Sequence, residues 1–326
     1  FQTLLMQGAA WTWSGSGNFT TARVQSGTLA LTGTLGATAS VAATIDAGAT
    51  LQANAQNLPL NVTDNGFVRF QQDLDGTYHG TISGSGALDK SGAGTLTLAP
   101  AAGNAYSGGT TLQQGTLAIG TDNAIGAASG SLRFDGGTLQ FTQRFDLAPT
   151  RAILVAAGGG TFDTQSFATT LAQPVTGSGA LTKTGSGMLL MTNVSTYRGP
   201  TTVAAGTLAL GDAAHANAAL AGNGGVTVAS GATLGGYGAV GGPVANGGTL
   251  AVANALPAFA GGPSGSFTVN GTLTNAALVR LGGNGAAPGN VLHVAGDYVG
   301  QSGTLALNTT VGADDAPSDR LAIAGG

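Results

Sequence analysis

The tripeptide Gly-Thr-Leu occurs nine times along the 326 residues of this chain, so repetition is the feature that most constrains its fold. Most copies continue with one further residue and then an apolar one, as at residues 94–98, 115–119 and 206–210. Side chains two positions apart lie on the same face of a β-strand. Each copy therefore predicts a short strand with two apolar side chains on its buried face. Strands this short must stack on copies of themselves to bury that face.

A longer unit contains two of these copies. Residues 84–98 match residues 177–191 at a constant offset of 93, and residues 106–120 match residues 197–211 at an offset of 91. The two-residue difference falls in the loop between the two halves, and repeat proteins accommodate insertions in such loops. The repeat is therefore structural rather than a bias in composition.

The composition favours strands joined by tight turns over helices. There are 58 glycines, no glutamate and only two lysines, Lys90 and Lys183, whereas Glu and Lys are among the residues that build surface helices. Glycine supplies the positive-φ conformations that tight turns need. Both lysines occupy the same position of the longer unit, where we expect each to cap a turn outside the core.

These features predict an all-β chain folded as a right-handed parallel β-helix, or β-solenoid, in the form of an elongated rod. Each coil of about 20 to 25 residues would contribute two or three short strands, with hydrogen bonds running from coil to coil. A two-sheet sandwich is the alternative fold. A sandwich, however, does not require the same pentapeptide on successive strands.

The low charge of the chain excludes several kinds of partner and site. Only 7% of the residues are charged, and the formal net charge is −4. No cluster of Lys and Arg provides the electrostatic footprint of a protein that binds nucleic acid or anionic membranes. The chain has no cysteine, which excludes disulfides and thiolate zinc sites. We expect no nucleic-acid partner, no cofactor and no metal.

Two kinds of segment resemble parts of autotransporter passenger domains. Residues 82–120 and 175–211 resemble the autotransporter-associated β-strand repeat of Gram-negative type V secretion. Residues 291–326, with Gly-Asp-Tyr at 296–298 and an acidic turn at 314–320, are similar to the start of the pertactin-like autochaperone region. The resemblance implies a cell-surface or secreted protein that crosses the periplasm and the outer membrane. It also implies one partner, the outer-membrane β-barrel of the protein's own precursor.

The repeat and the autochaperone resemblance predict two parts of the chain. Residues 1–265 would form the β-helical passenger rod, and residues 266–326 would form the C-terminal coils with the start of a truncated autochaperone region. No basic segment precedes an apolar one at the N-terminus, as a signal peptide would require. We therefore expect a cleaved passenger or a piece of a longer protein.

The sequence predicts no catalytic residue. A Ser-His-Asp arrangement needs a positioned imidazole, but His79, His215 and His293 lie in loop or strand-edge contexts away from any nucleophile motif. A β-helical polysaccharide lyase would need carboxylates beside Arg or Lys on one face. The best such mixture contains Asp135, Asp146, Asp163, Arg133, Arg144 and Arg151. We interpret these residues as surface solvation.

Two acidic groups contain the oxygen ligands that Ca²⁺ prefers. Asp314, Asp315 and Asp319 form the denser group, and Asp73 and Asp75 form the other. Aspartate is also a common turn residue. We therefore expect turns at both places and no metal site.

Two further features have both a structural and a binding interpretation. Trp11 and Trp13 share one face of a strand, where capping of the core explains them better than a platform for stacking sugars. Residues 212–265 are rich in Ala, Gly and Asn, and we expect looser loops there that project from the rod. Loops on a rigid scaffold often carry binding residues, so residues 253–264 are a candidate binding segment.

The leading functional hypothesis is an autotransporter passenger that acts in adhesion, self-association or host interaction and is not an enzyme. Its partner would be a host surface or matrix molecule, or the same protein on neighbouring cells. The alternative is a passive β-helical stalk that presents an enzymatic domain, such as a subtilisin-like protease or an esterase, located on its N-terminal side. A β-helical polysaccharide lyase is the third hypothesis.

Overall fold

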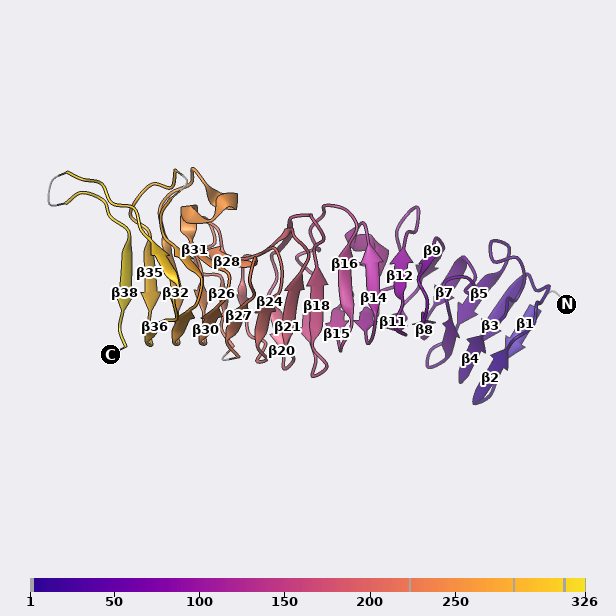
Figure 1. Cartoon of the computed structure of the whole chain (residues 1–326). Helices are drawn as coiled ribbons and strands as arrows, with labels where there is room; N and C mark the ends of the chain where they lie inside the picture. The colour runs from indigo at the N-terminus through magenta and orange to yellow at the C-terminus, as the bar shows by residue number, and fades with distance from the viewer. Residues whose placement is uncertain (1–2, 223, 284, 313–314, 326) are drawn as a thin grey trace. The chain divides into compact units, whose positions relative to one another are not determined.

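The computed structural model shows a parallel β-solenoid of about 14 turns, built from short strands (Figure 1). The described residues are 3–222, 224–283, 285–312 and 315–325. Within them, helix is limited to the 3₁₀ segments η1 (Asp122–Ile125), η2 (Ala253–Ala255) and η3 (Pro257–Phe259). No helix in this part of the chain has the length and apolar character needed to cross a membrane. The predicted all-β parallel β-helix is confirmed.

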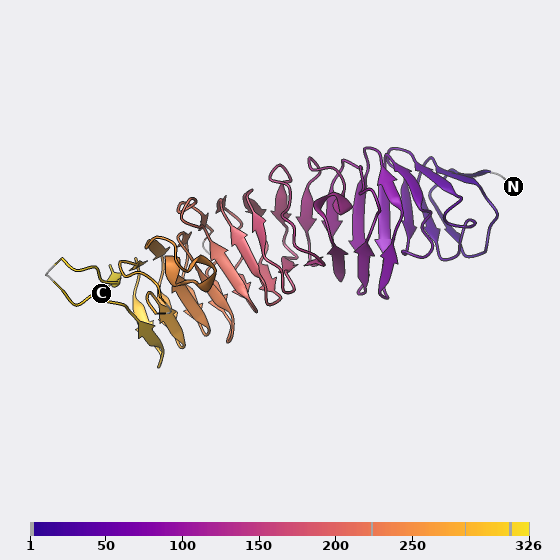
Figure 2. The ribbon, with the colours of Figure 1, turned by 90° about the horizontal axis from the view of Figure 1, so that it is seen from above.

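The chain consists of two compact units, Phe1–Gly160 and Thr161–Gly326. Within each unit, successive coils lie side by side, and their strands pair in parallel from one coil to the next (Figure 1, Figure 2). The functional division that the sequence predicts at residue 265 stays a prediction.

The described strands of the first unit form three parallel sheets, each named here after its first strand. The β1 sheet contains β1 (Thr3–Met6), β3 (Thr21–Val24), β5 (Ala42–Ile45), β7 (Asn61–Asp64) and β10 (Thr81–Ser83). The β2 sheet contains β2 (Ala10–Trp13), β4 (Thr28–Leu31), β6 (Thr50–Ala53), β8 (Phe67–Gln71), β11 (Ala87–Ser91), β13 (Thr110–Leu112), β15 (Leu132–Phe134) and β17 (Ile153–Val155). The β9 sheet contains β9 (Gly76–Tyr78), β12 (Thr95–Leu98), β14 (Thr116–Ile119) and β16 (Thr138–Phe141).

The described strands of the second unit form three sheets of the same kind, with β20 (Val175–Gly177) as an additional short strand. The β18 sheet contains β18 (Gly160–Asp163), β21 (Leu181–Thr184), β24 (Thr201–Val203), β27 (Val226–Val228), β30 (Val244–Asn246), β33 (Leu273–Asn275) and β36 (Tyr298–Gly300). The β19 sheet contains β19 (Thr169–Leu171), β22 (Met188–Met191), β25 (Thr207–Leu210), β28 (Thr233–Gly236), β31 (Thr249–Val252), β34 (Leu278–Arg280) and β37 (Thr304–Ala306). The β23 sheet contains β23 (Val194–Ser195), β26 (Ala219–Leu220), β29 (Ala239–Val240), β32 (Ser266–Val269), β35 (Val291–Val294) and β38 (Arg320–Ile323).

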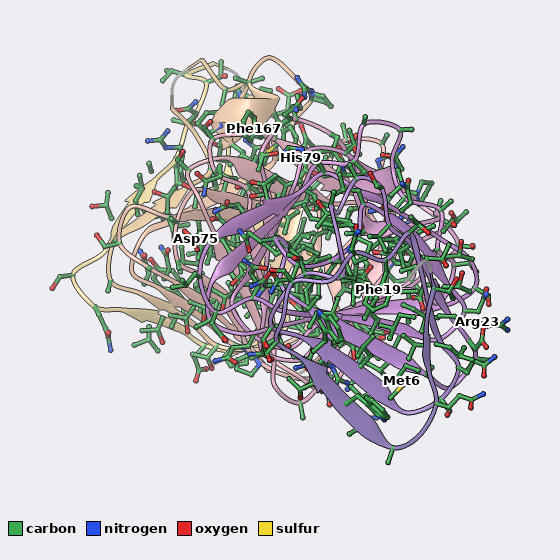
Figure 3. All side chains as sticks on the ribbon, turned by 90° about the vertical axis from the view of Figure 1, so that its right-hand side faces the viewer. Met6, Phe19, Arg23, Asp75, His79 and Phe167 are labelled. Atoms are coloured by element: carbon green, nitrogen blue, oxygen red, sulfur yellow. The ribbon has the colours of Figure 1, made fainter. Side chains whose placement is uncertain are left out.

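The Gly-Thr-Leu repeat produces columns of identical side chains inside each unit. In the first unit, Leu96, Leu117 and Leu139 pair in register on β12, β14 and β16, and all three are fully buried. Because side chains alternate along a strand, the intervening residues face outward. The same alternation places Met6 inside the first unit while Arg23 points away from its ribbon (Figure 3). Stacking like on like buries the apolar faces that a single coil could not bury alone.

Glycine is required where a coil turns directly against the previous one. Gly115 and Gly206 are equivalent positions of the longer repeat and have φ angles of +65° and +66°. A Cβ atom at Gly115 would overlap the carbonyl oxygen of Gly92 on the coil before it, and one at Gly206 would overlap that of Gly185. The repeat therefore keeps glycine both for its conformation and for lack of space.

The structure corrects the predicted environment of the two lysines. Lys90 and Lys183 do cap turns, as expected, but their side chains are fully buried in the interior rather than outside the core. Each ammonium group is surrounded by three backbone carbonyl oxygens. Buried charge is tolerated when its hydrogen-bonding capacity is met, and the inward position of the two residues could not be read from charge alone.

Part of the loop region that we predicted to project is built into the second unit instead. Residues 253–256 are buried. Leu256 packs against Ala209 and Ala251, which lie on the outer face of the β19 sheet, and Phe259 packs against the same cluster. We call residues 253–260 the cover segment. The cover segment buries a stretch of strand that would otherwise face outward. Only the later residues of the segment remain exposed.

Candidate binding surface

Polar side chains occupy five successive rungs on the outer face of the β2 sheet. In-register pairing places Gln52 beside Arg69, Arg69 beside Asp89, Asp89 beside Thr111, and Thr111 beside Arg133. We call these five residues the polar column. The residues immediately before and after each of them are buried, so strand alternation directs the column outward. Neighbouring rungs are about 4.8 Å apart, and the column is therefore a regularly spaced row of donors and acceptors.

Ion pairs orient the two arginines of the column. Arg69 Nη2 lies 3.3 Å from Asp89 Oδ2, and Arg133 Nη2 lies 2.9 Å from Asp135 Oδ2. Asp135 also accepts a 3.0 Å hydrogen bond from the backbone N–H of Gly158. The hydrogen bonds from Gly158 and then from Arg133 hold the pKa of Asp135 below its ordinary value. Both arginine side chains are still about two-fifths exposed, so part of each guanidinium group is accessible to a ligand, although Arg69 Nε is buried.

The chemistry of this surface suits binding better than proton transfer. Asp135 stays ionised at neutral pH and is a poor general acid there, because catalysis favours a pKa near the working pH. Lys90 lies on the same strand as Asp89 but points into the core. The arginines keep their charge at any working pH and can donate to carboxylate or hydroxyl oxygens.

The structure brings together only some of the acidic and basic residues that the sequence offered for a polysaccharide lyase site. Arg133 and Asp135 form an ion pair, as their spacing of two suggested. Arg144 and Asp146 are exposed on the loop after β16, and Asp163 belongs to the second unit. Their interpretation as surface residues therefore fits Arg144 and Asp146.

Arg151, the remaining member of that mixture, is a core residue. Its side chain is fully buried, and Nε and Nη2 each lie 2.9 Å from a carboxylate oxygen of Asp122. Its guanidinium group also donates to the carbonyl oxygens of Ile125, Gly126 and Gly130. Arg151 thus holds the η1 loop together and is not available to a substrate.

The three histidines lie on exposed positions. His79 follows β9, and His293 faces outward on β35. His215 Nδ1 lies 2.7 Å from Asp212 Oδ1. Burial raises the pKa of Asp212, but the hydrogen bonds from His215 and from the backbone of Ala214 outweigh this and lower it overall. The assignment of the three histidines as residues without a catalytic role stays a prediction.

Asp73 and Asp75 lie in the turn between β8 and β9. Asp75 Oδ1 accepts a 2.7 Å hydrogen bond from the N–H of Thr95, and Asp73 Oδ1 accepts one of 2.9 Å from Gln71 Nε2. The two carboxylates help to line a cavity of about 330 Å³. Its other lining residues are Asn54, Gln56, Gln71, Gln72 and Leu74. One oxygen of each aspartate is therefore engaged in holding the turn.

Asp319 is buried and stabilises the C-terminal coils. Oδ1 accepts hydrogen bonds from the N–H groups of residues 289 and 290, at 2.8 and 2.9 Å, and Oδ2 accepts one of 2.7 Å from the N–H of Asn308. Asp315 is exposed, and Asp314 lies outside the described residues. In the part of the chain that the structure describes, no three residues among His, Cys, Asp and Glu gather where they could hold a metal ion.

Trp11 and Trp13 have different environments although they share a strand face. The ring of Trp13 packs edge-on against Phe19, with 5.4 Å between centroids, and its Nε1 donates to the carbonyl of Thr34 at 3.1 Å. Trp11 pairs in register with Leu29 but is 62% exposed. The interpretation as a core cap therefore suits Trp13 better than Trp11.

The polar column itself was not found by sequence reasoning. Its members are about one coil apart, and they come together only when the register of the strands is known. A usable signal was present, because most members stand between two apolar residues in the sequence. Aligning these positions coil by coil would have revealed the row.

Comparison with protein families identifies three stretches of the chain. The passenger-associated-transport-repeat family matches residues 88–119 and 181–210. The autochaperone domain type 1 family matches residues 271–326. The first two stretches are the copies of the longer repeat, and the third covers the β-coils from β33 onward. No solved structure matches the chain.

Two curated proteins are similar to larger parts of the chain. The adhesin BmaC autotransporter of Brucella suis biovar 1 (strain 1330) is 32% identical over 262 residues, which is 77% of this chain and 6% of that protein. The uncharacterized protein YuaQ of Escherichia coli (strain K12) is 31% identical over 151 residues, which is 46% of this chain and 9% of that protein. The chain thus spans less than a tenth of the length of either relative. Together with the repeat and autochaperone matches, these similarities show that the chain belongs to the autotransporter passenger domains.

Proposed function

We propose that this chain is part of a surface-displayed autotransporter passenger that acts in adhesion, and that the polar column is its binding surface. The carrying observation is the row of five polar side chains on the outer face of one sheet, in which Asp89 is largely buried and the other four are partly exposed. The similarity to a protein named as an adhesin supports an adhesive role. The ligand would be a host surface or matrix molecule, with the same protein on a neighbouring cell as the other possible partner.

The charges of the column suit a polar ligand of low net charge. Arg69 is paired with Asp89 and Arg133 with Asp135, so the surface is close to neutral while it still offers many hydrogen-bonding groups. Single exposed ion pairs contribute little to stability. Exchanging the partner of Arg133, whose ion pair is exposed, for a ligand therefore costs little, and repeated weak contacts along the column add through multivalency.

The test compares two sets of arginine substitutions in the passenger displayed on cells. The double variant Arg69→Ala/Arg133→Ala removes both exposed guanidinium groups of the column. Arg23→Ala is the matched control, because Arg23 also forms an exposed ion pair, 2.9 Å from Asp46, but on the β1 sheet. Attachment to immobilised matrix proteins and glycans should fall about tenfold in the double variant, the effect of losing one or two hydrogen bonds to charged groups.

Three outcomes distinguish the hypotheses. Loss of attachment in the double variant with normal surface exposure supports the proposal, provided that Arg23→Ala attaches like the wild type. Equal attachment of all variants would contradict it and favour the passive stalk, in which binding or catalysis belongs to another part of the precursor. Release of unsaturated products from a polysaccharide would instead favour the lyase. The outer-membrane barrel of the precursor remains the proposed partner during export.

A further inference from the structure

The two lysines of the repeat have the same hydrogen-bonding environment. Lys90 Nζ donates to the carbonyl oxygens of Ser91, Gly92 and Gln114 at 2.9, 2.8 and 3.0 Å. In the second unit, Lys183 Nζ donates to three equivalent oxygens, those of Thr184, Gly185 and Ala205, at 2.8, 2.9 and 3.2 Å. An ammonium group has three N–H donors and no acceptor. Three carbonyls therefore satisfy it completely.

The three carbonyls of each lysine come from two different coils. For Lys90, two come from the last residue of β11 and the first residue of the turn to β12. The third, from Gln114, belongs to the next turn along the solenoid, between β13 and β14. Lys183 likewise reaches forward to Ala205. Each lysine thus joins its own turn to the turn of the coil on its C-terminal side.

The coil on the N-terminal side contributes the electrostatic effect of one carboxylate. Burial lowers the pKa of Lys90 to about 8, and the negative charge of Asp73 on the preceding coil partly opposes this. The same two causes act on Lys183, with Asp163 as the carboxylate. The hydrogen bonds described above run from each ammonium group to its own turn and to the coil that follows.

Two asparagines in the second unit occupy the same column as Lys183. Register pairing runs from Lys183 through Val203 and Val228 to Asn246 and Asn275. Both asparagines are buried. The two valines show that an apolar side chain also fits at this position.

The asparagines also donate to the coil that follows them. Asn246 Nδ2 donates to the carbonyl of Leu278 at 2.9 Å, and Asn275 Nδ2 donates to that of Thr304 at 3.3 Å. Both acceptors lie on the next strand of the β19 sheet. Lysine and asparagine thus achieve the same forward connection with different chemistry.

We propose that this corner position is a directional clamp, in which a polar side chain ties the turn of its own coil to the coil on its C-terminal side. The clamp is complete only when that following coil is in place, because one of its acceptors belongs to it. Before the following coil is in place, at least one N–H group of the clamping side chain has no hydrogen-bond acceptor in the protein. The stability of a clamped coil therefore depends more on the coil after it than on the coil before it.

The first test is a set of double-mutant cycles on the full chain, read by hydrogen exchange of the turn at residues 91–94. Lys90→Met keeps most of the apolar volume and removes the donors. Leu117→Ala weakens the following coil, and Val68→Ala weakens the preceding one; both side chains are fully buried. Coupling is the part of a combined effect that the single variants do not explain.

The expected result is asymmetric. Lys90→Met and Leu117→Ala should show a coupling of about tenfold in the opening equilibrium of residues 91–94, because the loss of hydrogen bonds to a charged group is of that size. Lys90→Met and Val68→Ala should couple by less than about twofold. Equal coupling on the two sides, or none on either, would overturn the proposal. If an alanine variant does not fold, Leu117→Val and Val68→Thr replace the pair.

A second test separates the charged donor from simple packing. Lys90→Ala leaves a space that a small alkylammonium ion can fill, whereas a neutral alcohol of the same length fills the space without three donors. Propylammonium should restore protection of residues 91–94, and 1-propanol should not. Equal protection by both would show that volume alone matters and would contradict the clamp. Lys183→Ala, read at residues 184–187, provides an independent repetition in the second unit.

Discussion

At the scale of single residues, Asp64 is the least expected feature of the first unit. It ends β7 with its side chain fully buried. Oδ1 accepts a 2.9 Å hydrogen bond from the N–H of Gly66, whereas Oδ2 is buried without a partner. Burial raises the pKa of Asp64 to about 6, because it outweighs the opposing effect of the backbone N–H groups of Gly66 and Val68. Folding thus favours the protonated form of the Asp64 carboxyl group.

Replacing Asp64 by Asn should remove a pH dependence of stability. The folded chain holds this proton up to about pH 6, whereas the unfolded carboxyl group releases it near 3.8. The free energy of unfolding of the wild type should therefore fall as pH rises from 4 to 7, by roughly 2–3 kcal/mol. Asp64→Asn should lack this component.

Urea unfolding at pH 4, 5, 6 and 7 measures the effect. Asp75→Asn is a suitable control, since Asp75 is exposed and also accepts a backbone hydrogen bond. Identical pH profiles for wild type and Asp64→Asn would show that the carboxylate is not penalised by its surroundings.

At the scale of an element, the η1 loop is organised by one buried arginine. Arg151 lies 26 residues beyond Ile125 in sequence, yet it donates to the carbonyl of Ile125 as well as to Asp122. The 3₁₀ segment at Asp122–Ile125 has no side-chain hydrogen bond at its N-cap. Its shape therefore depends on the guanidinium group contributed by a later coil.

Arg151→Met should destabilise the first unit by about 3–5 kcal/mol, because it leaves the carboxylate of Asp122 and several loop carbonyls without their buried partner. The loss should be local at first, with faster hydrogen exchange at residues 122–130. Arg144→Met is the control, since Arg144 is exposed on the same loop between β16 and β17. A change of less than about 0.5 kcal/mol in both variants, the usual range at the surface, would show that η1 is stable without Arg151.

At the scale of the whole molecule, the sequence predicted the repetitive core better than the surface. The leucines of the repeat are the buried columns that their spacing required, as at Leu208, Leu234 and Leu250. Periodicity could not place Lys183 in the interior, because a charged residue is usually exposed. The polar column escaped detection for a related reason, since its members meet only through strand register.

The repetitive core should also make the effect of a core mutation local. In repeat proteins, stability is close to a sum of coil and nearest-neighbour contributions. Leu234→Ala should cost about 2–5 kcal/mol and should raise hydrogen exchange in the second unit far more than at residues 95–119 of the first. Thr233→Ala, on the outer side of the same strand, is the control.

Equal exchange throughout the chain after Leu234→Ala would indicate one cooperative block instead. The comparison needs peptides from β25, β28 and β31, which contain the mutated column and its two neighbours, and peptides that cover residues 95–119 of the first unit.

The cover segment gives one outward strand face the composition of an interior. Ala209 and Ala251 face outward on their strands yet are completely inaccessible, because Leu256 packs over them. At both sites the side chain is a single methyl group packed in the same buried cluster as Leu256. The tolerance of these two sites to substitution should therefore depend on side-chain volume rather than polarity. A bulkier residue would displace the cover segment and expose the apolar cluster beneath it.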